Sequence, residues 1–220
     1  MKYKLVIFDL DGTILDTLDD LTDSTNHALR INGLPEHSED EIRRFVGDGI
    51  HKLIERAVPY GSGDIVIEKV FRDFNDYYKD HCFDKTKPYL GICECIENIK
   101  AAGIKIAVVS NKADYAVKEL CDLFFPEVFD MVIGEKKDVR RKPYPDSIEK
   151  ILYIMDIDRK EAVYVGDSEV DIKTAENAGI DEIAVGWGFR ESSCLRENGA
   201  KIIVKDTEEL YRLLTGRGIF

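Results

Sequence analysis

Short runs of β-branched and other apolar residues alternate along most of the chain with segments of helical periodicity. The runs expected to form strands are residues 3–8, 104–109, 131–133, 162–165, 182–185 and 201–204. The segments expected to form helices are residues 91–102, 115–124, 145–155, 170–178 and 208–214. Such alternation is typical of a parallel sheet covered by helices. The sequence therefore predicts an α/β fold with a Rossmann-like parallel sheet.

One long segment interrupts this alternation. Between residues 16 and 86 the apolar residues recur with helical spacing, and no convincing strand is present. Glycine and proline residues supply the turns between these helices. We therefore expect an α/β core domain from residues 1–15 and 87–220, with an α-helical cap domain inserted at residues 16–86. The hinges are expected near Asp16 and Lys87-Pro88.

Composition and charge exclude several classes of protein. Hydrophobic residues make up 44% of the 220, which is enough for a packed core. The formal net charge of −12 argues against a nucleic-acid partner, because such binding needs a basic stripe. No apolar run is long enough for a membrane span or a signal peptide. We expect a cytoplasmic protein without a membrane partner, and the sequence leaves open whether it is a monomer or a dimer.

Two carboxylates follow the first expected strand, in the segment Phe8-Asp9-Leu10-Asp11-Gly12-Thr13. Ligands of open α/β sheets bind outside the carboxyl ends of strands. Alternation along an extended chain would aim Asp9 and Asp11 in the same direction. Two converging carboxylates repel each other unless a cation lies between them, and Mg²⁺ suits oxygen ligands. Taken alone, this segment is equally consistent with the start of an ordinary loop.

Polar residues follow two further strands and precede one helix. Ser110 and Asn111 offer a hydroxyl and an amide to phosphate oxygens, although the pair is also a common helix cap. Lys142 precedes an expected helix, where a cation suits phosphate, and a solvated basic patch is the alternative. Gly166-Asp167-Ser168, with Asp171 three residues further on, forms a third acidic strand end.

These motifs, in this order, resemble those of the haloacid dehalogenase-like superfamily. The matching residues are Asp9-Leu10-Asp11-Gly12-Thr13, Ser110, Lys142, and Gly166-Asp167-Ser168 with Asp171. The resemblance covers essentially the whole chain, including the helical cap. The wider pattern, with Gly47-Asp48-Gly49 and Lys142-Pro143-Tyr144-Pro145, looks most like phosphoglycolate phosphatases and their near relatives. The resemblance implies a Mg²⁺-dependent phosphatase that hydrolyses a small organic phosphate monoester.

The resemblance also implies the catalytic roles. Asp9 would be the nucleophile that forms an aspartyl phosphate. Asp11 would protonate the leaving alkoxide and then activate the hydrolytic water. Lys142 would neutralise the charge of the transferring phosphoryl group, because positioning and electrostatics do most of the work in phosphoryl transfer.

The remaining implied roles concern binding. Asp9, Asp11 and Asp167 would hold the Mg²⁺ ion, with Asp11 using its backbone carbonyl. Asp171 and Thr13 would support the site without binding the ion directly. The phosphate-binding residues would be Ser110, Asn111 and Lys142. The cap would determine the substrate, and its cationic candidates for a substrate carboxylate are Arg43, Arg44, Lys52 and Arg56.

Several alternatives share this pattern. A phosphomutase of the β-phosphoglucomutase type would use the same core residues, although the cap segment 45–52 lacks the basic loop associated with those mutases. Phosphatases acting on pyrophosphate, nucleotides or sugar phosphates also fit. A non-catalytic phosphate-ligand binding protein on the same fold is a third alternative. A dehalogenase fits less well, because that reaction needs neither a metal nor a second aspartate.

Overall fold

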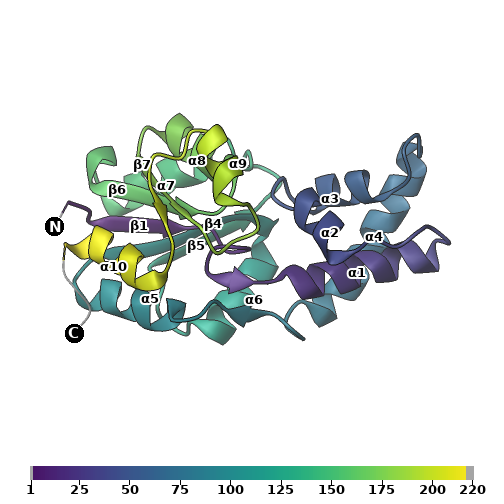
Figure 1. The fold of residues 1–220 in the computed structure, drawn as a ribbon, viewed down its shortest axis with the longest axis horizontal. Helices are drawn as coiled ribbons and strands as arrows, with labels where there is room; N and C mark the ends of the chain where they lie inside the picture. The colour runs from purple at the N-terminus through teal and green to yellow at the C-terminus, as the bar shows by residue number, and fades with distance from the viewer. Residues whose placement is uncertain (1, 217–220) are drawn as a thin grey trace. The chain divides into compact units, whose positions relative to one another are not determined.

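The computed structural model describes residues 2–216 and divides the chain into two compact units. The first consists of residues 1–15 and 88–220, and the second of residues 16–87. Two short strands, β2 (Leu15–Asp16) and β3 (Lys87–Pro88), pair with each other where the chain passes from one unit to the other. Figure 1 shows the first unit as an α/β structure and the second as a group of helices.

A six-stranded sheet, in the order β5-β4-β1-β6-β7-β8, forms the centre of the first unit. Its strands pair in parallel. The strands are β1 (Leu5–Phe8), β4 (Lys105–Ala113), β5 (Met131–Glu135), β6 (Ala162–Gly166), β7 (Asp181–Val185) and β8 (Ile203–Val204). The predicted α/β fold with a helical insert is confirmed.

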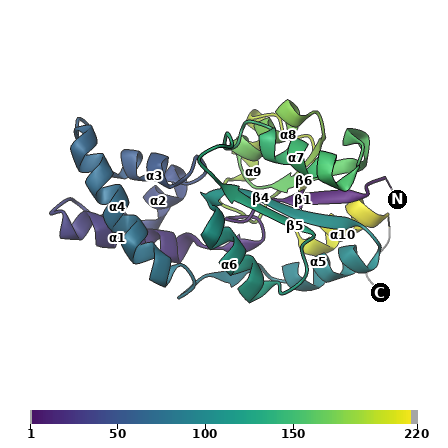
Figure 2. The ribbon, with the colours of Figure 1, turned by 180° about the vertical axis from the view of Figure 1, so that it is seen from behind.

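Helices cover both faces of this sheet (Figures 1 and 2). One face packs against α5 (Ile92–Ala101), α6 (Asp114–Phe124) and α10 (Thr207–Thr215). The other packs against α7 (Asp146–Met155) and α8 (Glu169–Ala178), and α9 (Ser192–Glu197) packs beside α8. A short 3₁₀ turn (Arg159–Glu161) precedes β6. The side chains of β1 alternate between the two faces, and all four are buried, as expected for a central parallel strand.

The strand β4 is longer than the sequence predicts. It continues beyond residue 109 to Ala113, and its register with β5 shifts between Val109 and Ala113. Ser110, Asn111 and Lys112 therefore lie in extended backbone rather than in a loop. The sequence does not predict α9, β2 or β3, because elements of six and two residues are too short to show a period.

Four helices make up the second unit: α1 (Leu18–Ile31), α2 (Glu39–Phe45), α3 (Ile50–Ala57) and α4 (Asp64–His81). Many of their apolar residues, among them Leu21, Leu29, Ile42, Leu53 and Phe74, are buried. Across residues 2–216, no helix is both long and apolar enough to cross a membrane.

A buried carboxylate ties the two ends of this helical unit together. Asp20, in the first turn of α1, is only 2% exposed. Its oxygens accept hydrogen bonds from the backbone amides of Lys85 (3.0 Å) and Thr86 (2.8 Å) and from the Thr86 hydroxyl (2.7 Å). A charged acceptor that satisfies several donors in a buried position contributes more stability than a typical surface residue.

We expect Asp20→Ala to lower the free energy of unfolding by about 3 kcal/mol, because it leaves the amides of Lys85 and Thr86 without an acceptor. Asp19→Ala, which removes an exposed carboxylate from the same turn, should cost less than about 0.5 kcal/mol. Urea denaturation and hydrogen exchange at the two amides measure these effects. Equal losses in the two variants would contradict the role given to Asp20.

Candidate active site

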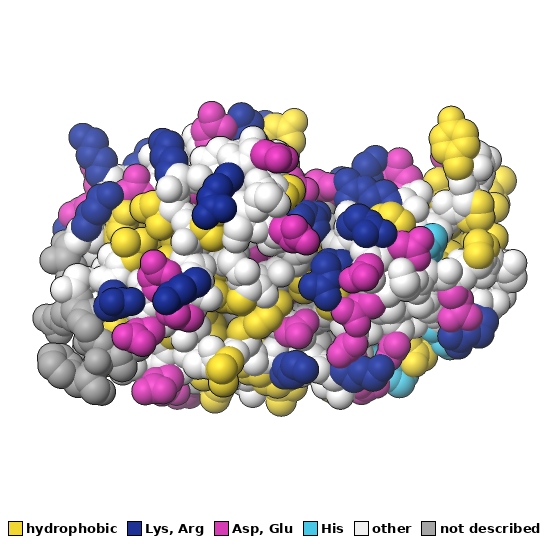
Figure 3. All heavy atoms as spheres, in the orientation of Figure 1, with side chains coloured by type: hydrophobic (Ala, Val, Ile, Leu, Met, Phe, Trp, Pro, Cys, Tyr) yellow, Lys and Arg dark blue, Asp and Glu magenta, His cyan; other side chains and the backbone are white. Residues whose placement is uncertain are grey.

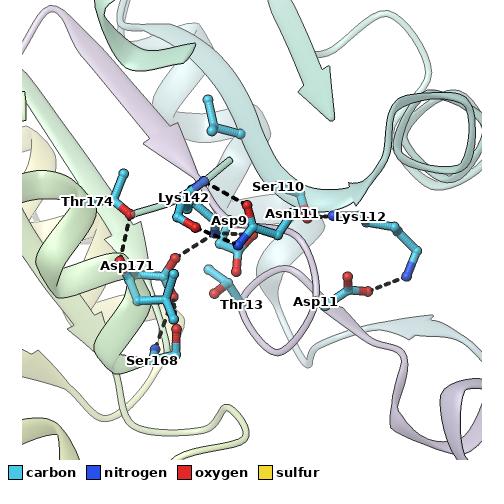
Figure 4. Close-up of polar contacts among 12 residues, drawn as sticks. Asp9, Asp11, Thr13, Ser110, Asn111, Lys112, Lys142, Ser168, Asp171 and Thr174 are labelled. Atoms are coloured by element: carbon cyan, nitrogen blue, oxygen red, sulfur yellow. Dashed lines mark hydrogen bonds and ion pairs between the residues drawn. The ribbon is translucent and has the colours of Figure 1, made fainter. Parts of the chain in front are cut away.

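The candidate site lies at the carboxyl ends of three neighbouring strands, β4, β1 and β6. Asp9 directly follows β1, and its backbone N–H donates to the Val165 carbonyl of β6 at 2.9 Å. Asp167 directly follows β6. Because the strands are parallel and adjacent, their ends place these side chains at one edge of the sheet. Figure 4 shows Asp9, Lys142 and Asp171 converging there.

Lys142 is a buried cation at the centre of this group. Its Nζ lies 2.8 Å from Asp9 Oδ1 and 2.7 Å from Asp171 Oδ1. The same ammonium donates to the Tyr164 hydroxyl at 3.0 Å, and that hydroxyl donates to the Val109 carbonyl at 2.8 Å. Burial alone would lower the pKa of Lys142, but the charges of Asp171 and Asp9 outweigh it and raise the pKa well above its usual value. Lys142 is therefore held in its charged form.

The carboxylates around Lys142 repel each other. Burial raises the pKa of Asp9 from 3.8 to about 7; Lys142 opposes this shift, and the charge of Asp171 adds to it. Burial also raises the pKa of Asp167 well above its usual value, and the charges of Asp171 and Asp9 add to that shift. One lysine thus faces an excess of negative charge in a buried site.

Asp171 accepts more hydrogen bonds than either of the other two carboxylates. Besides Lys142, it accepts hydrogen bonds from the backbone amides of Asp167 (3.2 Å) and Ser168 (3.1 Å) and from the Ser168 hydroxyl (2.6 Å). Asp171 and Ser168 together form the capping box of α8. The Asp171 side chain therefore orients the loop and Lys142.

The arrangement fits a divalent cation. Asp9, Asp167 and Asp171 each offer a carboxylate oxygen, and these oxygens all lie within 4.8 Å of one another. Asp9 Oδ1 accepts no aligned hydrogen bond from the described residues, although Lys142 lies beside it. A cation bound by Asp9 and Asp167 would relieve their repulsion, and an all-oxygen donor set is the kind that hard cations such as Mg²⁺ prefer.

The two aspartates of the first motif point to different partners, contrary to the sequence prediction. Asp9 faces Lys142, whereas Asp11 forms an ion pair with Lys112 at 2.7 Å (Figure 4). The prediction assumed extended chain, but β1 ends at Phe8 and the backbone bends at Leu10, between the two aspartates. Lys112 was not selected from the sequence, although it directly follows Ser110-Asn111 and its side chain is only 1% exposed.

Ser110 and Asn111 are buried beside the cluster. The Asn111 amide bridges the backbone of Lys142, donating to its carbonyl at 3.1 Å and accepting from its N–H at 2.8 Å. Asn111 therefore fixes the position of Lys142. The Ser110 hydroxyl accepts from the Lys112 N–H at 3.2 Å. Phosphate binding by Ser110 and Asn111 stays a prediction.

The loop after β7, residues 186–190, packs against the first motif. The Trp187 indole N–H donates to the Thr13 carbonyl at 3.0 Å, and the Phe189 N–H donates to Asp167 Oδ2 at 2.7 Å. Thr13 in turn donates to Asp167 Oδ1 at 3.1 Å. The Asp167 carboxylate is thereby held from two sides. The sequence gives no sign of the Phe189 donor, because a backbone amide carries no side-chain signal.

Two glycines allow these close approaches. A Cβ atom at Gly188 would overlap the Asp167 side chain and the Gly12 carbonyl. A Cβ atom at Gly12 would overlap the Asp167 carboxylate, and Gly12 also has a positive φ. The site therefore requires glycine at both positions.

Three of the four cap cations that were candidates for a substrate carboxylate form ion pairs within the helical unit. Arg43 pairs with Glu39 at 2.8 Å, Lys52 pairs with Glu55 at 2.7 Å, and Arg56 pairs with Asp48. These pairs are partly exposed, as expected for a solvated helix face. The face in Figure 3 likewise shows acidic and basic side chains interspersed, without a continuous basic stripe among the described residues.

A parallel sheet with this acidic edge, a buried lysine and an inserted helical cap fits a phosphoryl-transfer hydrolase, in which positioning and electrostatics do most of the work. The family model for haloacid dehalogenase-like hydrolases matches residues 6–185, and the chain belongs to this family. It is a phosphatase-family enzyme of the phosphoglycolate phosphatase-like group.

Individual relatives support this placement. The chain is 34% identical over 195 residues to a phosphoglycolate phosphatase of Mesorhizobium japonicum, covering 87% of this chain and 86% of the relative. It is 30% identical over 217 residues to a protein of Caldanaerobacter subterraneus provisionally named a pyrophosphatase, covering 98% and 96%. A crystal structure from Lactobacillus delbrueckii, provisionally named a phosphoglycolate phosphatase, is 38% identical, with a TM-score of 0.94 and 99% and 100% coverage.

The raised pKa of Asp9 predicts how magnesium stabilisation depends on pH. Between about pH 4 and pH 7 the folded metal-free protein keeps a proton on Asp9 that the unfolded chain has lost. The contribution of Asp9 to the free energy of unfolding is therefore present below about pH 4 and is lost as the pH rises to about 7. Because Mg²⁺ binds the carboxylate form, the increase in Tm on adding Mg²⁺ should be about 3 °C or more larger near pH 8 than near pH 5.

Thermal unfolding with Mg²⁺ and with chelator at the two pH values tests this expectation. Asp9→Asn serves as the control, and adding Mg²⁺ should increase its Tm only slightly at both pH values. An equally large increase at both pH values in the wild-type protein would contradict the assignment of Asp9 to the cation site.

Gly188→Ala should disrupt the site by pushing Asp167 away from the Phe189 amide. We expect kcat/KM for a phosphate ester to fall by about 100-fold or more, because small displacements of reacting groups are costly. Gly186→Ala is the matched control in the same loop, since its Cβ would approach no atom more closely than Val204 O at 3.2 Å. Steady-state kinetics and Mg²⁺-dependent thermal shifts measure both variants. Similar activity in the two would mean that the contact with Asp167 is unimportant.

Proposed function

We propose that the protein is a magnesium-dependent phosphatase that hydrolyses a small phosphate monoester, phosphoglycolate or a close analogue, through an aspartyl-phosphate intermediate on Asp9. The observation that carries this proposal is the position of Asp9. It is a buried carboxylate at the carboxyl end of the central strand, it lies 2.8 Å from a buried ammonium, and it belongs to a cation-type cluster of carboxylates.

Asp9 supplies the nucleophile. One of its carboxylate oxygens attacks phosphorus, a P–O bond forms to Asp9, and the ester P–O bond breaks. Lys142, whose raised pKa keeps it charged, stands beside Asp9 and offsets the negative charge of the incoming phosphoryl group. Mg²⁺ held by Asp9 and Asp167, together with the Asp11 carbonyl, would supply further charge neutralisation at the phosphoryl oxygens.

Asp11 supplies the proton transfers. It donates a proton to the leaving alkoxide and then takes a proton from the water that attacks the aspartyl phosphate. Its carboxylate is held by Lys112 at 2.7 Å in this structure, so the pair must open before Asp11 can reach the ester oxygen. Ser110 lies in the adjacent strand β4 and would offer its hydroxyl to the phosphoryl group.

The substrate proposal rests on relatives rather than on cap residues. Phosphoglycolate is the substrate named for a relative that is 34% identical, and pyrophosphate is named provisionally for one that is 30% identical. A comparison of phosphoglycolate with ethyl phosphate isolates the carboxylate, because the two esters otherwise have similar sizes. Pyrophosphate and glucose 6-phosphate represent the other classes of substrate.

We expect metal-dependent release of phosphate, with kcat/KM for phosphoglycolate at least about tenfold above that for ethyl phosphate. Asp9→Asn should lower kcat by about 10³-fold or more, since it removes the nucleophile. Asp122→Asn, which changes an exposed aspartate on α6, should keep wild-type activity. A phosphate-release assay with Mg²⁺ and with chelator measures all of these.

Each other outcome points to a different function. Preference for pyrophosphate would indicate that the protein is a pyrophosphatase. Interconversion of hexose phosphates that requires a bisphosphorylated activator would assign a mutase. Phosphate release that persists in Asp9→Asn would refute Asp9 as the nucleophile.

A further inference from the structure

The loop that connects β7 to α9 contains a charged pair to which the proposed chemistry assigns no role. Arg190, near the end of this loop, donates from Nε to Glu169 Oε2 at 2.9 Å and from Nη2 to Glu169 Oε1 at 3.2 Å. Glu169 is the first residue of α8. The contact is therefore a two-point ion pair between this loop and the helix that follows β6.

This ion pair is better shielded from water than an ordinary surface pair. The side chains of Arg190 and Glu169 are 13% and 34% exposed. Lys173 and Glu176, which form an ion pair on the same helix, are 55% and 67% exposed. A shielded two-point contact between a guanidinium and a carboxylate holds its geometry more firmly than an exposed pair does.

Both members of the pair lie close in the chain to Asp167, one of the carboxylates of the cation-type cluster. Glu169 follows Asp167 by two residues. Arg190 directly follows Phe189, whose backbone N–H donates to Asp167 Oδ2 at 2.7 Å. The ion pair and this hydrogen bond, together with the short chain segments that join them, form a closed ring. Opening the ion pair would release the side of the loop that carries the Phe189 amide.

The two halves of the loop are held by different contacts. In the first half, the Trp187 indole N–H donates to the Thr13 carbonyl at 3.0 Å. In the second half, the Phe189 side chain is buried, but apolar packing is not directional. Arg190 adds a directional contact there, so it can fix where the Phe189 amide points.

The Asp167 carboxylate requires such fixed donors because its surroundings oppose its charge. It is buried, and the charges of Asp9 and Asp171 act against its ionised form. The Phe189 N–H and the Thr13 hydroxyl donate to its two oxygens. A carboxylate that is already held in position loses less freedom when it binds a cation, and therefore binds the cation more tightly.

We propose that the ion pair between Arg190 and Glu169 holds the Phe189 amide against Asp167 and thereby raises the affinity of the site for Mg²⁺. This inference rests on the Mg²⁺ site of the proposed function. Arg190 and Glu169 are positioning residues in this proposal, because they act on the ion through Asp167.

The double variant Glu169→Gln/Arg190→Met removes the ion pair without changing the net charge, so a change in Mg²⁺ affinity reports position rather than charge. Isothermal titration calorimetry should show a Kd for Mg²⁺ raised by about tenfold, the lower end of the range for lost partners of metal ligands. Lys173→Met/Glu176→Gln removes the exposed ion pair of the same helix and is the matched control. Its Kd should equal that of the wild-type protein.

Hydrogen exchange of the metal-free protein provides a measurement that does not involve Mg²⁺. Loss of the ion pair should accelerate exchange of the Phe189 amide about tenfold more than exchange of the β1 amides of residues 6–8. Equal acceleration of both would mean that the pair contributes only to overall stability, and the proposal would then be wrong.

The calorimetric outcomes separate this inference from the proposed function. Equal Kd values for the double variant and the wild-type protein would refute the role of the ion pair and leave the Mg²⁺ site intact. A wild-type protein that binds no Mg²⁺ would refute the Mg²⁺ site and this inference together. Arg190→Lys keeps the charge but loses the two-point contact, so it should raise the Kd by a smaller factor. It provides the same test if the double variant does not fold.

Discussion

The ion pairs of Lys142 with Asp9 and Asp171 are the interaction on which the rest of the site depends. A buried ammonium is favourable only where carboxylates face it, and these carboxylates would repel each other more strongly without it. Lys142 is in turn fixed at its backbone by Asn111 and at its ammonium by Tyr164. The segment before α7 is thereby joined to the ends of β1, β4 and β6.

The parallel sheet makes this concentration of charge possible. Adjacent parallel strands end at one edge, so residues far apart in the sequence meet there without long side chains. Lys142 does not neutralise all of the carboxylates, and hydrogen bonds hold the others in position. Thr13 and the Phe189 amide donate to Asp167, and the α8 capping box holds Asp171. Such a site is poorly stable alone and well suited to a cation and a phosphoryl group. That combination is what phosphoryl transfer requires.

The strand ends were predictable from the sequence, but several contacts were not. Asp9, Lys142, Asp167 and Asp171 were selected because each adjoins a strand end or a helix start, and the structure brings them together. The direction of Asp11 was not predictable, because it depends on the bend at Leu10 and on Lys112 reaching it from β4. The donor at Phe189 is a backbone amide, and the sequence indicates only that Tyr164 is a core residue of β6. These contacts are properties of tertiary structure and leave no local pattern.

The central claim is that Asp9 becomes phosphorylated during turnover. The most direct measurement is acid quenching of the enzyme during turnover of phosphoglycolate with a radiolabelled phosphate group, followed by mapping of the labelled peptide. Our account predicts one labelled peptide containing Asp9, with label that hydroxylamine releases as expected for an acyl phosphate. The Asp9→Asn variant should carry no label. Turnover with no labelled protein, or with label on another residue, would contradict the account.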